Sequence, residues 1–129
     1  MFNDDDVIHT YTRREALDDG VLMDAGAMAQ EAGFTLPVAL TAQVWATCVS
    51  WSSEERAPQD EDGRLWDVLW MASLAARAAA RRGDSGRVAF EVRVVPRGGR
   101  RPRVTKLVLM LGPGDRGEPV VTIMEPGED

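Results

Sequence analysis

The spacing of apolar residues changes abruptly at Gly83, and a chain with such a change must combine a long helix with a sheet. In residues 64–82 the apolar residues recur every three or four positions, as in a helix that buries one face. In residues 87–94 valine or phenylalanine stands at every second position, as in a half-buried strand. The sequence therefore predicts a helix over 64–82, ended by Gly83, and a strand over 87–94 directly after it.

Two further strands are expected in the C-terminal third. Residues 104–111 and 120–124 are rich in valine, leucine and isoleucine, and each follows a segment of glycine, proline and charged residues. The first connection, 96–102, is short and basic, so strands 87–94 and 104–111 are expected to form a hairpin. Three consecutive strands after a series of helices predict an α+β fold, with N-terminal helices packed on a C-terminal three-stranded antiparallel meander.

The N-terminal half predicts shorter helices. Thr12 and Glu15 have the spacing of a capping box, in which each side chain bonds a backbone amide of the first turn. Gly33 is suited to end a second helix, and the apolar residues after Pro37 recur at mixed three- and four-residue spacing, with Thr41 as a helix cap. The expected helices are 13–18, 26–32 and 42–53, and residues 21–23 form a short extended segment between the first two.

The expected organisation is an acidic flexible start over residues 1–10 and a single α+β domain over residues 11–129. Cys48 is the one cysteine of the chain, so an intrachain disulfide is excluded. No apolar run approaches the roughly 18 residues of a bilayer-spanning helix, and the start carries acids where a signal peptide carries bases. These features favour a cytoplasmic protein that neither carries a cleaved signal nor spans a membrane.

Charge is distributed unevenly along the chain. Residues 1–62 hold 13 acids and 3 bases, whereas residues 63–129 hold 8 acids and 12 bases. Such polarity allows the acidic half to occupy a partner's basic groove, or the basic segment to meet phosphate. It equally allows the two parts to neutralise each other within the molecule, and the sequence leaves this question open.

Two groups of charged residues are candidate binding sites. The first is acidic and lies at the end of the first helix and in an exposed loop predicted over 52–63. The second is basic and occupies the tip of the predicted hairpin, where guanidinium groups suit phosphate but no aromatic residue is present for base stacking. The acidic candidates are Asp18, Asp19, Glu54, Glu55, Asp60, Glu61 and Asp62, and the basic candidates are Arg97, Arg100, Arg101 and Arg103.

Residues that carry enzyme chemistry are sparse. A calcium loop needs regularly spaced oxygen ligands, and residues 60–63 supply only a fragment of that pattern. Cys48 falls on an apolar helix face and is expected to pack in the core, while His9 stands in the start expected to be flexible. We therefore expect no metal site, no cofactor and no enzyme activity. Trp66 and Trp70 share one helix face and are also expected to pack in the core. If that face is exposed instead, two large aromatic side chains beside the acidic loop form an interface for a partner.

Five segments combine specific residue patterns, and Gly63–Met71, which reads GRLWDVLWM, is too distinctive to be explained by chance. The others are Tyr11–Asp24, Phe34–Thr41, Leu111–Asp115 and Glu118–Met124. Together they resemble a family of uncharacterised short proteins encoded on plasmids, integrated elements and phages of bacteria. The family brings no established catalytic residues. What the resemblance implies is a setting, because small acidic proteins from such elements are often inhibitors of host defences, including restriction and CRISPR systems.

Two hypotheses for the function follow. The first is a non-enzymatic binding protein of a mobile genetic element that inhibits a host defence complex, of the anti-CRISPR or anti-restriction type, by occluding a nucleic-acid-handling surface with its acidic residues. Its partner would be a protein or ribonucleoprotein complex of the bacterial host. The alternative is a small nucleic-acid-binding accessory factor that uses the basic hairpin over 97–103.

Overall fold

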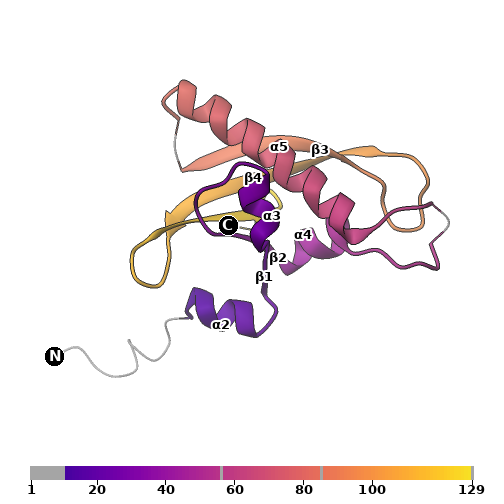
Figure 1. Cartoon of the computed structure of the whole chain (residues 1–129), viewed down its shortest axis with the longest axis horizontal. Helices are drawn as coiled ribbons and strands as arrows, with labels where there is room; N and C mark the ends of the chain where they lie inside the picture. The colour runs from indigo at the N-terminus through magenta and orange to yellow at the C-terminus, as the bar shows by residue number, and fades with distance from the viewer. Residues whose placement is uncertain (1–10, 56, 85, 129) are drawn as a thin grey trace.

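A computed structural model describes residues 11–55, 57–84 and 86–128. It is a mixed α+β structure in which one long helix lies along a face of a twisted five-stranded sheet (Figure 1). The helices are α2 (Arg13–Asp18), α3 (Ala27–Glu31), α4 (Ala42–Val44), the π-helix η1 (Trp45–Val49) and α5 (Glu61–Arg81), and the strands are β1 (Leu22–Asp24), β2 (Val38–Thr41), β3 (Arg87–Val94), β4 (Arg103–Pro113) and β5 (Pro119–Met124).

The C-terminal half follows the sequence prediction closely. The long helix α5 begins at Glu61, slightly earlier than expected, and β3, β4 and β5 follow it as an antiparallel meander. The side chains of β3 alternate in burial, because Phe90 and Val92 are buried while Glu91 and Arg93 are exposed. The period of two residues therefore predicted both this strand and the face that it buries.

The prediction of a three-stranded, purely antiparallel sheet is wrong. The strands β1 and β2 extend the sheet to the order β1-β2-β5-β4-β3, and β2 runs parallel to β5. Val38, Ala39 and Leu40 of β2 are all buried, because a strand covered on both faces shows no alternation. Without alternation, this apolar run gives no strand signal, and the sequence pattern predicted no strand before the helix capped by Thr41.

The predicted helix over 42–53 is shorter than expected. Its first turn forms α4 as predicted, because the Thr41 hydroxyl accepts the N–H of Val44 at 3.2 Å. The backbone then continues as the π-helix η1, which ends at Val49. Residues 50–55 and 57–60 lie in a loop that leads into α5.

The core lies between α5 and one face of the sheet. Leu69 of α5, Leu40 of β2 and Ile123 of β5 have no exposed surface and belong to one cluster of buried side chains. The side chain of Thr122 in β5 lies on the opposite face of the sheet from its neighbour Ile123, which is in the core. Arg13 of α2 donates to the hydroxyl of Thr122 on that opposite face. The centre of the sheet is therefore covered on both faces, by α5 and by α2.

Candidate functional site

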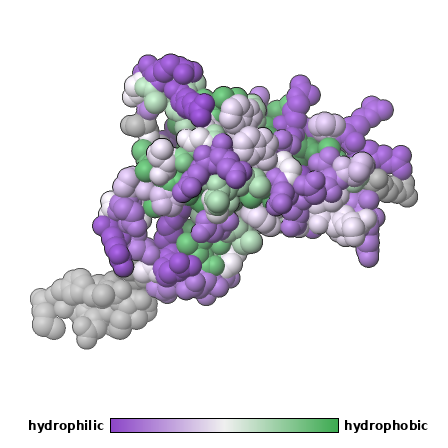
Figure 2. All heavy atoms as spheres, viewed as in Figure 1, coloured by the Kyte–Doolittle hydropathy of each residue, from purple (hydrophilic) through white to green (hydrophobic). Residues whose placement is uncertain are grey.

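The acidic loop and the basic hairpin tip meet at one end of the molecule. The loop before α5 and the tip between β3 and β4 lie at the same end of α5 (Figure 1). The backbone N–H of Gly98 in the tip donates to the Glu55 carboxylate in the loop at 3.0 Å. Hydrophilic side chains gather over this end of the molecule in Figure 2. We call residues 54–62 and 97–103 together the charged end.

A buried arginine connects the segments that carry the charged end. Arg64 is 3% exposed although it stands near the start of α5. Its guanidinium donates to the carbonyl oxygens of Val49 at 2.9 Å and Val95 at 2.7 Å, which lie at the end of η1 and directly after β3. Its Cζ atom lies 4.4 Å from the ring centroid of Trp51, in cation–π geometry. One side chain thus joins η1, α5 and the base of the hairpin tip.

The sequence analysis missed this role of Arg64. Burial lowers the pKa of its guanidinium, and the backbone carbonyls replace the water that it loses. Carbonyl groups at the end of a helix also carry partial negative charge, which favours a cation at the end of η1. A signal was present, because Arg64 stands one and two helical turns before Val68 and Ala72, which are completely buried and share its side of the helix.

Most of the acidic candidates at the charged end already accept hydrogen bonds from the backbone. Asp60 caps α5 by accepting the Gly63 N–H at 2.6 Å, and Glu61 accepts the Trp51 N–H at 3.0 Å. These acids stand at the positive end of the α5 dipole, where they stabilise the helix. Among the described residues of the charged end, the acids whose carboxylates accept no hydrogen bond are Glu54 and Asp62, and both are exposed.

The acidic candidates Asp18 and Asp19 lie elsewhere, at the end of α2 (Figure 1). Asp18 pairs with Arg14, with 3.1 Å between Oδ1 and Nη2. Asp19 accepts the Tyr11 hydroxyl at 2.7 Å, and this hydrogen bond raises the pKa of Tyr11 to about 12. The predicted acidic residues are therefore divided between two places, and only those over 54–62 belong to the charged end.

The basic candidates are exposed on the hairpin tip. They are Arg97, Arg100, Arg101 and Arg103. Because the tip is bonded to the loop through Gly98 and Glu55, these guanidinium groups share one end of the molecule with carboxylates. The charged end therefore presents both signs of charge, rather than separate acidic and basic faces.

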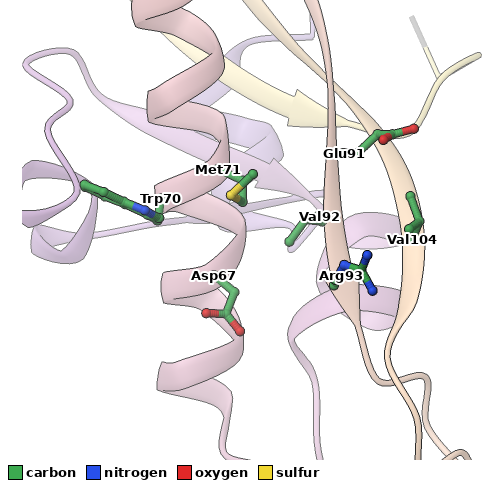
Figure 3. Close-up of a pocket in the computed structure, with 7 residues that line it drawn as sticks. All are labelled: Asp67, Trp70, Met71, Glu91, Val92, Arg93 and Val104. Carbon is green, nitrogen blue, oxygen red and sulfur yellow. The ribbon is translucent and has the colours of Figure 1, made fainter.

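A groove of about 460 Å³ opens beside the charged end, between α5 and β3 (Figure 3). Met71 of α5 and Val92 of β3 point toward one another across it. The residues that line it are Asp67, Trp70, Met71, Glu91, Val92, Arg93 and Val104. Its walls are thus a helix with exposed apolar side chains and a strand at the edge of the sheet.

The two tryptophans of α5 have different surroundings. Trp66 packs against the core, as predicted, whereas Trp70 is 38% exposed beside the groove, so the prediction of core packing is wrong for Trp70. Their rings are stacked, with centroids 5.8 Å apart and an angle of 12° between the planes. The core therefore supports Trp70 through Trp66 while leaving part of its ring accessible.

The groups that could perform chemistry are few in the described part of the chain. Cys48 is buried as predicted, and this burial raises the pKa of its thiol. His9 lies outside the described residues. Over 11–55, 57–84 and 86–128, no three side chains of His, Cys, Asp or Glu gather as metal ligands. Within the same ranges no helix combines the length and apolar character needed to cross a membrane.

The fold and these surfaces define a small mixed α+β protein with a charged end and a groove beside one sheet edge. The model of a family of unknown function, DUF6573, matches residues 1–129, and the chain belongs to this family. The resemblance to a family of uncharacterised proteins is confirmed in this respect, while its setting on mobile elements stays a prediction. No curated protein and no solved structure matches the chain.

Proposed function

We propose that the protein is a non-enzymatic binding protein whose charged end occludes a nucleic-acid-handling surface of a host defence complex. The supporting observation is the junction of acidic loop and basic tip through the Gly98 N–H and the Glu55 carboxylate. Surfaces that handle nucleic acid carry arginine and lysine, which attract exposed carboxylates. The proposed setting is a bacterial mobile element, and the proposed partner is a protein or ribonucleoprotein complex in the host cytoplasm.

The internal order of the charged end supports such a role. The Arg64 guanidinium donates to the carbonyls of Val49 and Val95, in the segments that lead to the acidic loop and to the hairpin tip. The carboxylates of Asp60 and Glu61 accept hydrogen bonds from backbone amides. Charges that are already fixed in position lose less conformational entropy when a partner binds. A pattern of both signs also discriminates among partners, because a mismatched partner brings like charges together.

Charge reversal at two positions tests this proposal. Glu54→Lys and Asp62→Lys together change the charge without removing a hydrogen bond of the described structure. The partner is first captured from a bacterial lysate and identified, and its affinity for wild type and variant is then measured at low and moderate salt. We expect the double variant to bind about tenfold more weakly and to lose most of the salt dependence.

The control is Asp18→Lys with Asp19→Lys, which makes the same change of charge on α2, away from the charged end, and in addition breaks the ion pair with Arg14 and the hydrogen bond from Tyr11. Its affinity for the partner is expected to equal that of the wild type. Equal losses in both double variants would show that net charge alone matters, and unchanged binding in the first would remove the charged end from the contact.

The second candidate function is nucleic-acid binding by the hairpin tip, favoured by the exposure of Arg97, Arg100, Arg101 and Arg103. A gel-shift titration of the purified protein with duplex and single-stranded DNA and RNA distinguishes the two. Direct binding that weakens steeply with salt and disappears in Arg100→Glu with Arg101→Glu would favour this second function. The first function expects no direct binding at moderate salt.

A further inference from the structure

The strand β3 forms an edge of the sheet, so one of its sides has no neighbouring strand within the part of the chain that the structure describes. The N–H of Leu111 donates to the Gly86 carbonyl at 2.6 Å, and this pair continues the antiparallel register of β3 with β4. In such a ladder the backbone groups of every second residue point to the same neighbour. Gly86, Val88, Phe90 and Val92 therefore face β4, and the residues whose backbone groups face the free edge include Ala89, Glu91 and Arg93.

This edge has few of the usual protections against strand addition. Among the residues that the structure describes, no hydrogen bond reaches the backbone groups of Ala89, Glu91 or Arg93. Natural edge strands are usually short, bulged, interrupted by proline or lined by charged side chains, and of these features β3 has only the charges. It has eight residues without proline or glycine, whereas β1 at the other edge has three. The charged side chains along β3 also alternate in sign, so they favour a strand of complementary charge.

An exposed apolar wall stands beside the same edge. Met71 and Leu74 of α5 are 38% and 39% exposed and lie three residues apart on one side of the helix. Val92 faces Met71 across the groove (Figure 3). Since side chains of a strand alternate between its faces, a strand added beside β3 directs every second side chain into this groove and covers its apolar wall.

We propose that the free edge of β3 is a docking site for an extended peptide segment of a partner protein, which joins the sheet as an antiparallel strand. The segment carries apolar residues opposite Val92 and Phe90, which enter the groove. On the outer face it carries an acid opposite Arg93 and a base opposite Glu91. This surface differs from the charged end, and the inference does not depend on the function proposed there.

A second copy of the chain fits the edge less well. If β3 pairs with β3 in the register that joins all its outward residues, Arg87 stands opposite Arg93 twice, and like charges in that position destabilise a sheet. The pairing also brings two α5 helices to the same face of the joined sheet. A single strand carries no such helix, so the edge and groove favour a peptide.

The probe is a fluorescein-labelled peptide of sequence Glu-Val-Lys-Val-Thr-Leu-Glu. In antiparallel pairing its first residue stands opposite Arg93, its lysine opposite Glu91 and its threonine opposite Ala89. We expect saturable binding by fluorescence anisotropy. We also expect hydrogen exchange at the amides of Ala89, Glu91 and Arg93 to slow on binding, because those of Val88, Phe90 and Val92 already bond β4.

A charge rescue tests the register. Arg93→Glu sets two acids opposite one another and is expected to weaken binding about fivefold. A peptide whose first residue is lysine should restore the affinity for this variant and bind the wild type more weakly. Arg116→Glu in the exposed turn between β4 and β5 is the matched control and should leave both affinities unchanged.

Four results would overturn the proposal. The first three are absence of binding by the probe at millimolar concentration, failure of the lysine peptide to restore binding to Arg93→Glu, and exchange at the three outward amides that stays unchanged in the complex. The fourth is a combination of two observations made without peptide: protection of these amides that rises with protein concentration, and a dimer in sedimentation equilibrium. Together they would assign the edge to a second copy of the chain.

Discussion

Two arginines join segments that are far apart in the sequence, and they do so in different surroundings. Arg64 is 3% exposed, and its partners are backbone carbonyls beside the core. Arg13 on α2 is only partly buried and donates to the Thr122 hydroxyl at 2.7 Å and the Val121 carbonyl at 2.8 Å. The first connects the charged end to the core, whereas the second attaches a short helix to the outer face of the sheet.

The two arginines differ in whether water can replace their hydrogen bonds when the side chain is removed. The carbonyl groups around Arg64 are shielded by the core, so they lose a partner that water cannot replace. Around Arg13 water has access, and α2 keeps another attachment, because the Asp115 carboxylate accepts the N–H groups of Arg13 at 2.7 Å and Arg14 at 2.9 Å. The charged end thus depends on one buried group, and α2 depends on several exposed ones.

The largest effect is expected for Arg64→Ala. We expect a loss of about 3 kcal/mol in the free energy of unfolding, because several charge-assisted hydrogen bonds disappear and buried carbonyls remain unsatisfied. Urea unfolding followed by circular dichroism measures this loss. Arg64→Lys keeps the charge but not the forked donors, so it should recover little of the stability. A loss below about 1 kcal/mol in the alanine variant would contradict the central role of Arg64.

A smaller effect is expected for Arg13→Ala. The variant should lose about 1 kcal/mol, because its hydrogen bonds lie where water can enter. Hydrogen exchange should accelerate at the amides of α2 while the exchange at β4 stays close to that of the wild type. Equal acceleration in α2 and β4 would show that α2 is part of the global folding unit and not a separately attached helix.

The attachment of α2 should also depend on pH. Hydrogen bonds from the backbone N–H groups of Arg14 and Arg13 hold the pKa of Asp115 below its ordinary value of 3.8. A carboxylate with a lowered pKa stabilises the folded state above its ordinary pKa, and this contribution disappears as the pH falls through the lowered value. The protection factors of the α2 amides, which compare the observed exchange with that of an unfolded chain at the same pH, should therefore fall in acid in the wild type, and Asp115→Asn should remove that part of the pH dependence.

The fold could be predicted from sequence where one periodic pattern decided the structure. The change of period at Gly83 predicted α5 and β3 because each of them buries one face against a single core. The strand β2 was missed because both its faces are covered and its partner in the parallel pairing, Val121 opposite Val38, lies far along the chain. Local patterns contain no information about such a distant neighbour.

The candidate site shows the same limit. Composition identified the acids over 54–62 and the arginines over 97–103, but their meeting depends on the path of the chain around Arg64. The alternation of β3 was equally clear, yet its position at the edge follows only from the order of all five strands. The sequence thus predicts the charged and alternating segments, and the tertiary structure determines which of their residues act together.

The smallest effect should come from the ion pair beside Arg13. Arg14 and Asp18 are joined at 3.1 Å one turn apart, but their side chains are 69% and 64% exposed. A double-mutant cycle with Arg14→Ala and Asp18→Ala should give a coupling energy of about 0.3 kcal/mol that fades at high salt. Arg13 and Arg14 are adjacent, so a coupling as large as the loss in Arg13→Ala would mean that charge, and not the burial of the guanidinium, decides what an arginine contributes to this protein.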